Sequence, residues 1–270
     1  MKDIYIRTFT GAIFLIAILG SILLHQLAFF GVLFIFSSLA LNEYFLLAAK
    51  NESRKHNLIF FFLGIIIYSL TGLIGVGLLD IRFAAIIIPL FLLVIVFELF
   101  RKINPSWTRI GIYFTGFVYV SIPFGLLNFF YIIPETDTFQ VGILVGLFVI
   151  VWSSDVFAYL VGSMIGKHRI LERISPKKSW EGSIGGLLFA LLAAYILSLF
   201  FTQLSLSRWL IMAVIIVVFG TLGDFAESML KRQAGVKDSG NLLPGHGGVL
   251  DRFDAVLFAT PFVYFYLNLF

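Results

Sequence analysis

The stretch VGILVGLFVIVWSSDVFAYLVGSMIG, residues 141–166, carries a single charged side chain, Asp155. About 20 apolar residues are enough to cross the hydrocarbon core of a bilayer. Comparable runs recur along the whole chain, which has 270 residues, 60% of them hydrophobic and 13% charged, and a mean hydropathy of +1.03. Typical soluble domains have about a quarter of their residues charged. The sequence therefore predicts an all-α, polytopic integral membrane protein.

Breaking the chain at polar clusters, glycines and prolines predicts about nine transmembrane helices. They cover about residues 8–25, 28–48, 58–78, 82–100, 108–131, 139–165, 182–202, 207–232 and 250–269. Lys2 and Arg7 precede the first run, but no A-x-A cleavage pattern follows it, so we expect a retained helix. We expect one continuous membrane domain, with residues 1–135 as a packing scaffold and residues 136–270 as the catalytic part.

The positive charges predict the orientation. If the amino terminus is cytoplasmic, all of the 19 lysines and arginines fall in cytoplasmic segments except Arg82 and Arg208. An excess of Lys and Arg on the cytoplasmic side is the asymmetry that sets membrane topology. We therefore expect the amino terminus inside and the carboxyl terminus outside. The chain has no cysteine, which excludes disulfides and thiolate metal ligands.

Acids lie inside the predicted spans. Asp155 is about ten residues from the end of its helix, roughly 15 Å from the cytoplasmic end. In GTLGDFAESMLKRQAG, residues 220–235, Asp224, Glu227 and Lys231 share one helical face. A charge in hydrocarbon costs several kcal/mol, so these acids need a cationic or metal partner. A salt bridge that only packs the helices is the alternative for the second group, and Gly162 with Gly166 is more typical of close helix packing than of a site.

A polar loop leads into the last predicted helix: KDSGNLLPGHGGVLDRFD, residues 237–254. Asp251 and Asp254 are three residues apart and therefore neighbours on that helix. The glycines around His246 leave backbone N–H groups open to an anion, although a merely flexible loop is the alternative. Carboxylates beside cations favour Mg²⁺ bound together with substrate phosphates. The pattern predicts a polyphosphorylated substrate, and the apolar surroundings predict a lipid as the second one.

One long motif resembles a known family. SMLKRQAGVKDSGNLLPGHGGVLDRFD, residues 228–254, is similar to the signature of the phosphatidate cytidylyltransferases, or CDP-diacylglycerol synthases: S-x-x-K-R, four residues, K-D, then P-G-H-G-G, two residues, D-R-x-D. The segments SDVFAYLVGSMIGKH and SPKKSWEG resemble the other polar segments of that family, with Ser179 where threonine is common. The resemblance covers the carboxyl-terminal half of the chain.

The resemblance implies a nucleotidyltransferase that transfers CMP from CTP to phosphatidic acid, giving CDP-diacylglycerol and pyrophosphate in phospholipid biosynthesis. It implies Mg²⁺, with a second metal ion as an option, and a homodimer. We expect a bacterial inner-membrane enzyme whose active site faces the cytoplasm, and no nucleic-acid partner. The second pKa of a phosphate monoester lies near 6, so the phosphatidate oxygen is already anionic at neutral pH and no general base is needed.

The expected site residues fall into two groups. Asp224 and Asp251 are expected to hold the catalytic metal or metal pair, with Asp254 and Asp155 as further ligands or as partners of the ligands, and Lys231 is the third catalytic residue. The expected substrate-binding residues are Arg232, Lys237, His246, Gly247, Gly248, Arg252, Ser175, Lys177 and Lys178. Within this group Ser175, Lys177 and Lys178 are assigned to the lipid phosphate.

Two rival interpretations stay open. A CTP-dependent transferase acting on an isoprenoid or ether-lipid phosphate would leave the same polar motifs, because recognition of acyl chains by apolar helices leaves little trace in a sequence. An ion-coupled transporter would also carry intramembrane acids, but along a path open to both faces. Here the acids expected on the outer side are confined to Asp80, Glu135 and Asp137.

Overall fold

The structure, a computed structural model, describes residues 2–50, 52–102, 104–131, 141–242, 245 and 247–269, with side chains from residue 9 onward. In this part of the chain every long element is a helix, and residues Arg169 and Ser179 form an isolated antiparallel bridge. The all-α prediction is confirmed.

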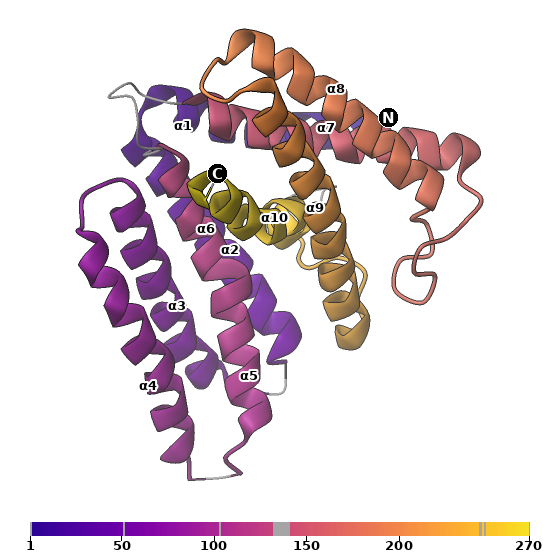
Figure 1. The fold of residues 1–270 in the computed structure, drawn as a ribbon. Helices are drawn as coiled ribbons and strands as arrows, with labels where there is room; N and C mark the ends of the chain where they lie inside the picture. The colour runs from indigo at the N-terminus through magenta and orange to yellow at the C-terminus, as the bar shows by residue number, and fades with distance from the viewer. Residues whose placement is uncertain are drawn as a thin grey trace. The chain divides into compact units, whose positions relative to one another are not determined.

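Figure 1 shows the helices in chain order. Their bounds are α1 (Lys2–Leu24), α2 (Gln26–Ala48), α3 (Arg54–Gly75), η1 (Ile81–Ile86), α4 (Ile87–Leu99), α5 (Trp107–Gly116), η2 (Phe117–Ser121), α6 (Ile122–Leu126), η3 (Leu127–Tyr131), α7 (Val141–Ile165), α8 (Trp180–Phe200), α9 (Leu206–Ala234) and α10 (Leu250–Leu269). The short elements η1 and α4 form one continuous helix, as do the four elements of residues 107–131.

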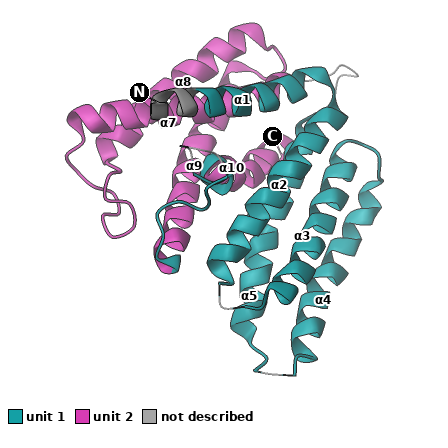
Figure 2. Cartoon of the chain, turned by 180° about the vertical axis from the view of Figure 1, so that it is seen from behind, with its two compact units in different colours: residues 1–132, 234–252 teal, residues 133–233, 253–270 magenta. Residues whose placement is uncertain are grey.

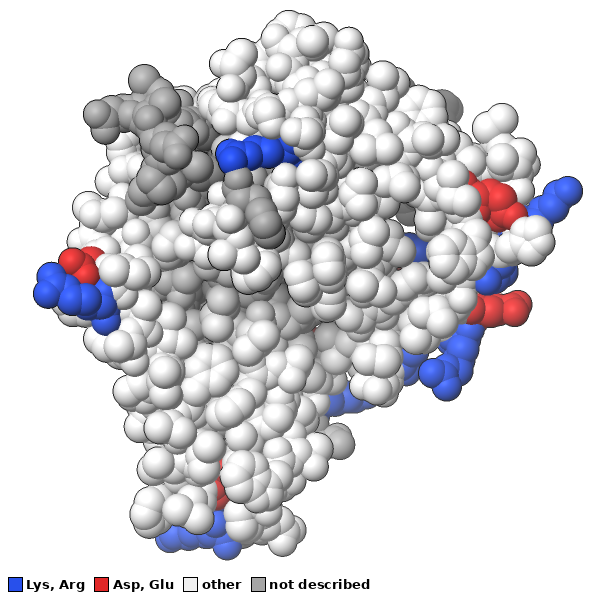
Figure 3. Space-filling model, viewed as in Figure 1, with Lys and Arg blue, Asp and Glu red and all other residues white. Residues whose placement is uncertain are grey.

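Within the described residues, seven helices are long and apolar enough to cross a membrane. They are Gln26–Ala48, Arg54–Gly75, Ile81–Leu99, Trp107–Tyr131, Val141–Ile165, Trp180–Phe200 and Leu206–Ala234. The described apolar part of α1 is shorter, Phe9–Leu24, and α10 opens with three charged residues. In Figure 3 the charged side chains of the visible face form a few small groups and the rest of that face is uncharged. The chain is an integral membrane protein, while the count of nine spans and their orientation stay predictions.

The helix limits agree with the sequence-based ones to within a few residues. The largest difference is at the start of α1, expected at about residue 8 and observed at Lys2. At α3, expected over about residues 58–78, the helix is observed over Arg54–Gly75. The Ser53 hydroxyl accepts the His56 N–H at 3.4 Å and so caps the helix, which places Arg54 and Lys55 in its first turn and not in a loop. The capping serine was the missed signal.

The chain forms two compact units, residues 1–132 with 234–252 (unit 1) and residues 133–233 with 253–270 (unit 2), as Figure 2 shows. In unit 1, α3 packs against α2, α4 and the helix of residues 107–131. That helix contains a π-helical segment, Phe117–Ser121, just before Pro123. Proline has no N–H to donate, and a π-helical turn is one way for a helix to absorb this loss. The predicted division into a scaffold and a catalytic half stays a prediction.

In unit 2, small residues bring helices into close contact. A Cβ atom at Gly186 of α8 would lie 2.8 Å from the Ser154 carbonyl oxygen of α7, and one at Gly162 would lie 3.4 Å from the Gly182 Cα. Gly162 therefore serves helix packing, as its spacing indicated. On the other side of the unit, a Cβ at Gly223 of α9 would lie 2.5 Å from the Asp254 carbonyl oxygen of α10. The glycine lets α9 and α10 meet backbone to backbone, next to Asp224.

Candidate active site

Three acids meet where α9 packs on α10 in unit 2, and we call Asp224, Glu227 and Asp254 the carboxylate centre. The Asp254 carboxyl group is joined to Asp224 by a hydrogen bond and lies close enough to Glu227 for their charges to interact. Asp254 is 8% exposed and Glu227 1%. Asp254 also accepts the N–H of Ala255 at 2.8 Å. Neighbouring carboxylates in a buried place repel one another, so the centre stabilises added positive charge.

Two lysines supply part of that charge. Lys178 pairs with Asp224, and its ammonium nitrogen lies 4.9 Å from the centroid of the Phe225 ring. Lys231 pairs with Glu227 across one helical turn, with 2.6 Å between Nζ and Oε2. Three acids therefore face two lysines. The hydrogen bond between the Asp224 and Asp254 carboxyl groups needs one proton, and this proton balances the third acid. A metal ion that replaced the proton would find two carboxylates side by side.

Lys178 lies in the loop that precedes α8. Backbone hydrogen bonds join the two ends of this loop: the Trp180 N–H donates to the His168 carbonyl at 2.9 Å, and the Ile170 N–H donates to the Lys178 carbonyl at 3.2 Å. Ser179 then caps α8, its hydroxyl accepting the Gly182 N–H at 3.2 Å. Threonine, the residue more common at this position in the family that the motif resembles, offers the same hydroxyl. The departure at Ser179 therefore keeps the local structure.

Asp251, the second expected metal ligand, belongs to unit 1 and organises the glycine-rich loop. Its Oδ2 accepts the Ser239 N–H at 2.9 Å, the Ser239 hydroxyl at 2.9 Å and the Gly248 N–H at 2.8 Å. Gly247 has φ +81°, and a Cβ there would lie 2.6 Å from Asp251 Oδ2. Only glycine suits that conformation and that space. The Gly248 amide thus already has an acceptor in the structure, and phosphate binding by Gly247 and Gly248 stays a prediction.

Sequence reasoning missed Glu43. This acid of α2 is 6% exposed and accepts the backbone N–H groups of Val249 and Leu250 at 3.0 and 2.8 Å. It is the one acid in the apolar run FSSLALNEYFLLAA, residues 36–49. Asp155 was selected as an acid inside a predicted span, and the same criterion selects Glu43. It was passed over because the first five predicted helices were treated as scaffold.

The remaining predicted residues are placed as follows. Asp155 lies on α7 with an exposed side chain, and Ser175 and Lys178 are half-buried. The side chains of Lys177, Arg232, Lys237 and Arg252 are exposed, and His246 lies outside the described residues. The structure brings Asp224 together with Asp254 and Lys178, and Glu227 with Lys231. In the described ranges no three acids or histidines take up a metal-binding arrangement, so the four-aspartate metal site stays a prediction.

The donor set nevertheless suits a divalent cation such as Mg²⁺. Asp224 and Asp254 offer hard oxygen atoms, which Mg²⁺ prefers, and it characteristically binds through one or two carboxylates with water and phosphate completing its shell. The Lys178 ammonium, paired with Asp224, shows that the centre accepts a positive charge at this point. A pair of carboxylates with an exchangeable cation beside it fits such an ion.

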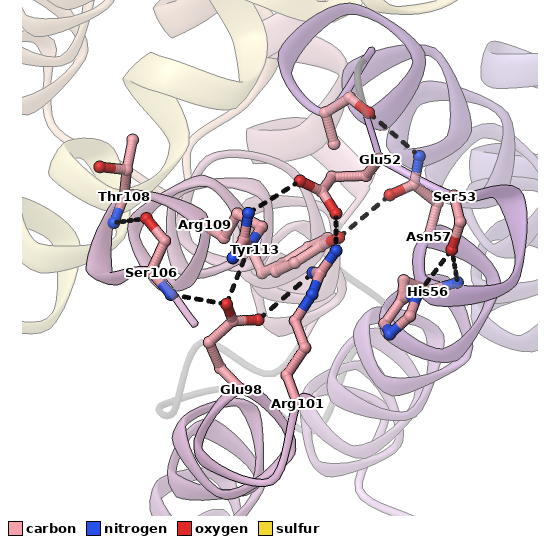
Figure 4. Close-up of polar contacts among 11 residues, drawn as sticks. Glu52, Ser53, His56, Asn57, Glu98, Arg101, Ser106, Thr108, Arg109 and Tyr113 are labelled. Carbon is pink, nitrogen blue, oxygen red and sulfur yellow. Dashed lines mark hydrogen bonds and ion pairs between the residues drawn. The ribbon is translucent and has the colours of Figure 1, made fainter. Parts of the chain in front are cut away.

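A second ionic group lies in unit 1, and we call Glu52, Glu98, Arg101 and Arg109 the Glu–Arg network (Figure 4). Arg101 Nη2 lies 2.8 Å from Glu52 Oε2, and Arg109 Nε lies 2.8 Å from Glu98 Oε1. Arg109 also reaches Glu52 at 3.4 Å, and Glu98 accepts the Ser106 N–H at 2.7 Å. Arg101 and Arg109 were interpreted as orientation charges alone, whereas the structure pairs both with buried acids.

Comparison with known proteins gives matches over the whole chain. The model of the family described as "Cytidylyltransferase family" matches residues 5–270. A Bacillus subtilis (strain 168) protein named phosphatidate cytidylyltransferase is 34% identical over 277 residues, covering 100% of both chains. Proteins of the same name from Staphylococcus haemolyticus (strain JCSC1435) and Staphylococcus aureus (strain COL) are 49% identical over 116 residues and 46% identical over 145 residues. These two matches cover 42% and 53% of this chain, and 44% and 53% of the relatives.

Proposed function

Because the chain belongs to the cytidylyltransferase family, we propose that it is a phosphatidate cytidylyltransferase, transferring CMP from CTP to phosphatidate to give CDP-diacylglycerol and pyrophosphate. The full-length match to the Bacillus subtilis protein of that name carries the proposal. The carboxylate centre, where two aspartates lie together beside a lysine, supports it, since two highly charged phosphates react only where cations offset their repulsion.

The reaction needs little from a general base. The second pKa of a phosphate monoester is near 6, so the phosphatidate oxygen is an anion at neutral pH. That oxygen forms a bond to the α-phosphorus of CTP, and the bond from this phosphorus to the oxygen bridging to the β-phosphate breaks. Pyrophosphate leaves with the electron pair of that bond. The task of the protein is therefore to hold the two phosphates in line and to balance their charge.

We assign the metal ligands to Asp224, Asp254, Asp155 and Asp251. One Mg²⁺, or two, bound there would neutralise phosphate charge and stabilise the leaving pyrophosphate. The buried Asp254 keeps its carboxyl group beside that of the half-buried Asp224, and Asp251 is held by three hydrogen bonds. Both arrangements orient an oxygen ligand before the ion arrives.

The cations are assigned to the two substrates. The CTP phosphates are assigned to Lys231, Arg232, Lys237, His246, Arg252 and the amides of Gly247 and Gly248. The lipid phosphate is assigned to Ser175, Lys177 and Lys178. Lys178 is paired with Asp224 in the structure, so it can turn to a phosphate only when another cation balances that acid. Lys231 is held beside Glu227 in the same way.

We propose nine spans, with α1 and α10 added to the seven long apolar helices, in a bacterial inner membrane. The amino terminus and the active site face the cytoplasm, and the protein is a homodimer. The bacterial relatives support the type of membrane, and the distribution of Lys and Arg supports the orientation. The homodimer rests on the family resemblance alone.

Because the chain has no cysteine, single cysteines report topology directly. A membrane-impermeant maleimide added to intact cells should label Arg208→Cys and leave Lys102→Cys unlabelled; the opposite pattern would reverse the topology.

The activity is tested by incubating purified protein with phosphatidate, labelled CTP and Mg²⁺. We expect labelled CDP-diacylglycerol and pyrophosphate, with both lost when a chelator removes the metal. If phosphatidate gave no CDP-lipid but an isoprenoid or ether-lipid phosphate did, the enzyme would be a CTP-dependent transferase with a different lipid substrate. Ion flux in vesicles without CTP consumption would make it a transporter.

A further inference from the structure

Glu43 of α2 is buried against residues 239–240 and 248–250 of the glycine-rich loop, within unit 1. We call residues 239–250 the 239–250 loop and describe only its residues 239–242, 245 and 247–250. Its Oε1 accepts the Val249 N–H at 3.0 Å and its Oε2 accepts the Leu250 N–H at 2.8 Å. Leu250 is the first residue of α10. The first N–H groups of a helix have no partner within it, and a negative charge is favoured beside them. Glu43 therefore caps α10 from another helix.

The loop wraps closely around this carboxylate. A Cβ atom at Gly240 would lie 2.6 Å from Glu43 Oε1, and one at Gly248 would lie 2.4 Å from Glu43 Oε2 and 2.1 Å from the Ser239 hydroxyl oxygen. A side chain at either position would have to displace the carboxylate or the hydroxyl. Gly240 and Gly248 are thus explained by the space that Glu43 and Ser239 occupy, independently of any ligand.

Ser239 links Glu43 to Asp251. Its hydroxyl oxygen is 3.0 Å from Glu43 Oε2 and 2.9 Å from Asp251 Oδ2. A serine hydroxyl has one proton, so it donates to one of the two carboxylates at a time. When the hydroxyl donates to Glu43, Asp251 Oδ2 still accepts the N–H groups of Ser239 and Gly248. The loop and the orientation of Asp251 are then kept in either state of the hydroxyl.

From these contacts we propose that Glu43 is a positioning residue: its carboxylate holds the 239–250 loop in the conformation from which Asp251 and the Gly247 and Gly248 amides meet the metal and the nucleotide. The roles of Asp251 and the amides rest on the proposed function, whereas the fixing of the loop by Glu43 does not. Glu43 touches neither substrate in this proposal and acts only through the loop.

The test compares Glu43→Gln with Glu98→Gln. Both glutamates are buried acids of unit 1, but the partners of Glu98 are Arg101, Arg109 and Ser106, outside the loop. Glutamine has nearly the shape of glutamate but only one acceptor oxygen, so Glu43→Gln cannot satisfy the two amides and the hydroxyl. Each variant is purified as the full chain in the same detergent and measured by amide hydrogen exchange and by steady-state kinetics.

We expect Glu43→Gln to speed exchange of peptides covering residues 239–250 about 10-fold or more, and to leave peptides covering residues 98–109 unchanged. Its kcat should fall about 10–100-fold, the effect typical of losing a partner that orients a metal ligand, and its Mg²⁺ requirement should rise. The KM for phosphatidate should stay near that of the wild type. Glu98→Gln should show the reverse exchange pattern with an unchanged kcat.

Ser239→Ala serves as a second, milder variant, since it removes the hydroxyl and leaves the backbone N–H that Asp251 accepts. It should show the same exchange pattern with a smaller loss of kcat, and it carries the test if Glu43→Gln does not fold. Unchanged exchange of the loop in both variants would overturn the proposal. Faster exchange with unchanged kcat and Mg²⁺ requirement would overturn the positioning role as well. A wild-type protein without cytidylyltransferase activity would instead refute the proposed function, which the exchange data do not depend on.

Discussion

The Glu–Arg network of unit 1 and the carboxylate centre of unit 2 are both groups of buried and half-buried charges, but they differ in the ratio of acids to bases. In the network two acids face two guanidinium groups, with N–O distances of 2.8 to 3.5 Å. In the centre three acids face two ammonium groups. A group with equal numbers of acids and bases needs no further charge, whereas a third carboxylate is costly to ionise until a proton or a metal ion balances it. The difference separates a structural group from a binding site.

The two groups also differ in their basic residues, and this difference supports the same distinction between a structural group and a binding site. Arg109 uses its planar fork to reach Glu98 and Glu52 together, which suits permanent pairing. The centre uses Lys178 and Lys231, whose single ammonium groups sit on flexible stems and exchange partners easily. A lysine that leaves its acid for a phosphate is what a site for two phosphorylated substrates requires.

The largest effect should come from Asp224→Asn. The change removes an acid of the centre and the partner of Lys178, so we expect turnover to fall by more than about 100-fold, beyond the loss typical of an indirect partner. Size-exclusion chromatography and thermal unfolding should show folded protein. Asp80→Asn is the matched control, since Asp80 forms a surface pair with Arg82 and should keep full activity. Normal Mg²⁺-dependent formation of CDP-lipid by Asp224→Asn would refute the metal assignment.

An intermediate effect should follow the loss of Lys231. Lys231→Met takes away the ammonium beside Glu227, which is 1% exposed, and a broken buried pair costs about 3–5 kcal/mol. The double variant Glu227→Gln with Lys231→Met removes both charges and should recover the unfolding free energy. If Lys231 binds CTP, the KM for CTP of this double variant should still be raised about 10-fold. A wild-type KM for CTP in the double variant would make Lys231 purely structural.

The smallest effect on catalysis should come from Arg109→Lys. The change keeps the charge but loses the fork that reaches two acids, so the free energy of unfolding should fall by about 1–3 kcal/mol. Thermal unfolding in detergent measures this, and kcat at low temperature should equal that of the wild type. A loss of kcat in fully folded Arg109→Lys would mean that the network contributes to catalysis after all.

The sequence was sufficient to predict the helices and the contacts between side chains of one helix. Hydrophobic runs located the long apolar helices, and the helical period placed Glu227 and Lys231 one turn apart, where the structure pairs them. The polar motif led to the family, which the full-length match confirms.

Contacts between segments far apart in the sequence could not be predicted from it. Lys178 and Asp224 are 46 residues apart, and Glu43 and Leu250 are 207 apart. Periodicity says which face of a helix a residue occupies but not which other helix covers that face. For the same reason Arg101 and Arg109 looked like orientation charges, because their acids lie on other turns and other elements. The capped start of α10 was hidden because its cap comes from α2.

The central claim, that the carboxylate centre binds a divalent cation in competition with Lys178, is tested most directly by titrating purified protein with Mn²⁺ in the absence of substrates and following the free ion by electron paramagnetic resonance. We predict that Asp224→Asn weakens Mn²⁺ binding at least about 10-fold. Lys178→Met should tighten it, because a competing cation is removed from Asp224, and Arg109→Lys should leave it unchanged. Equal Mn²⁺ affinity in the wild type, Asp224→Asn and Lys178→Met would contradict the account.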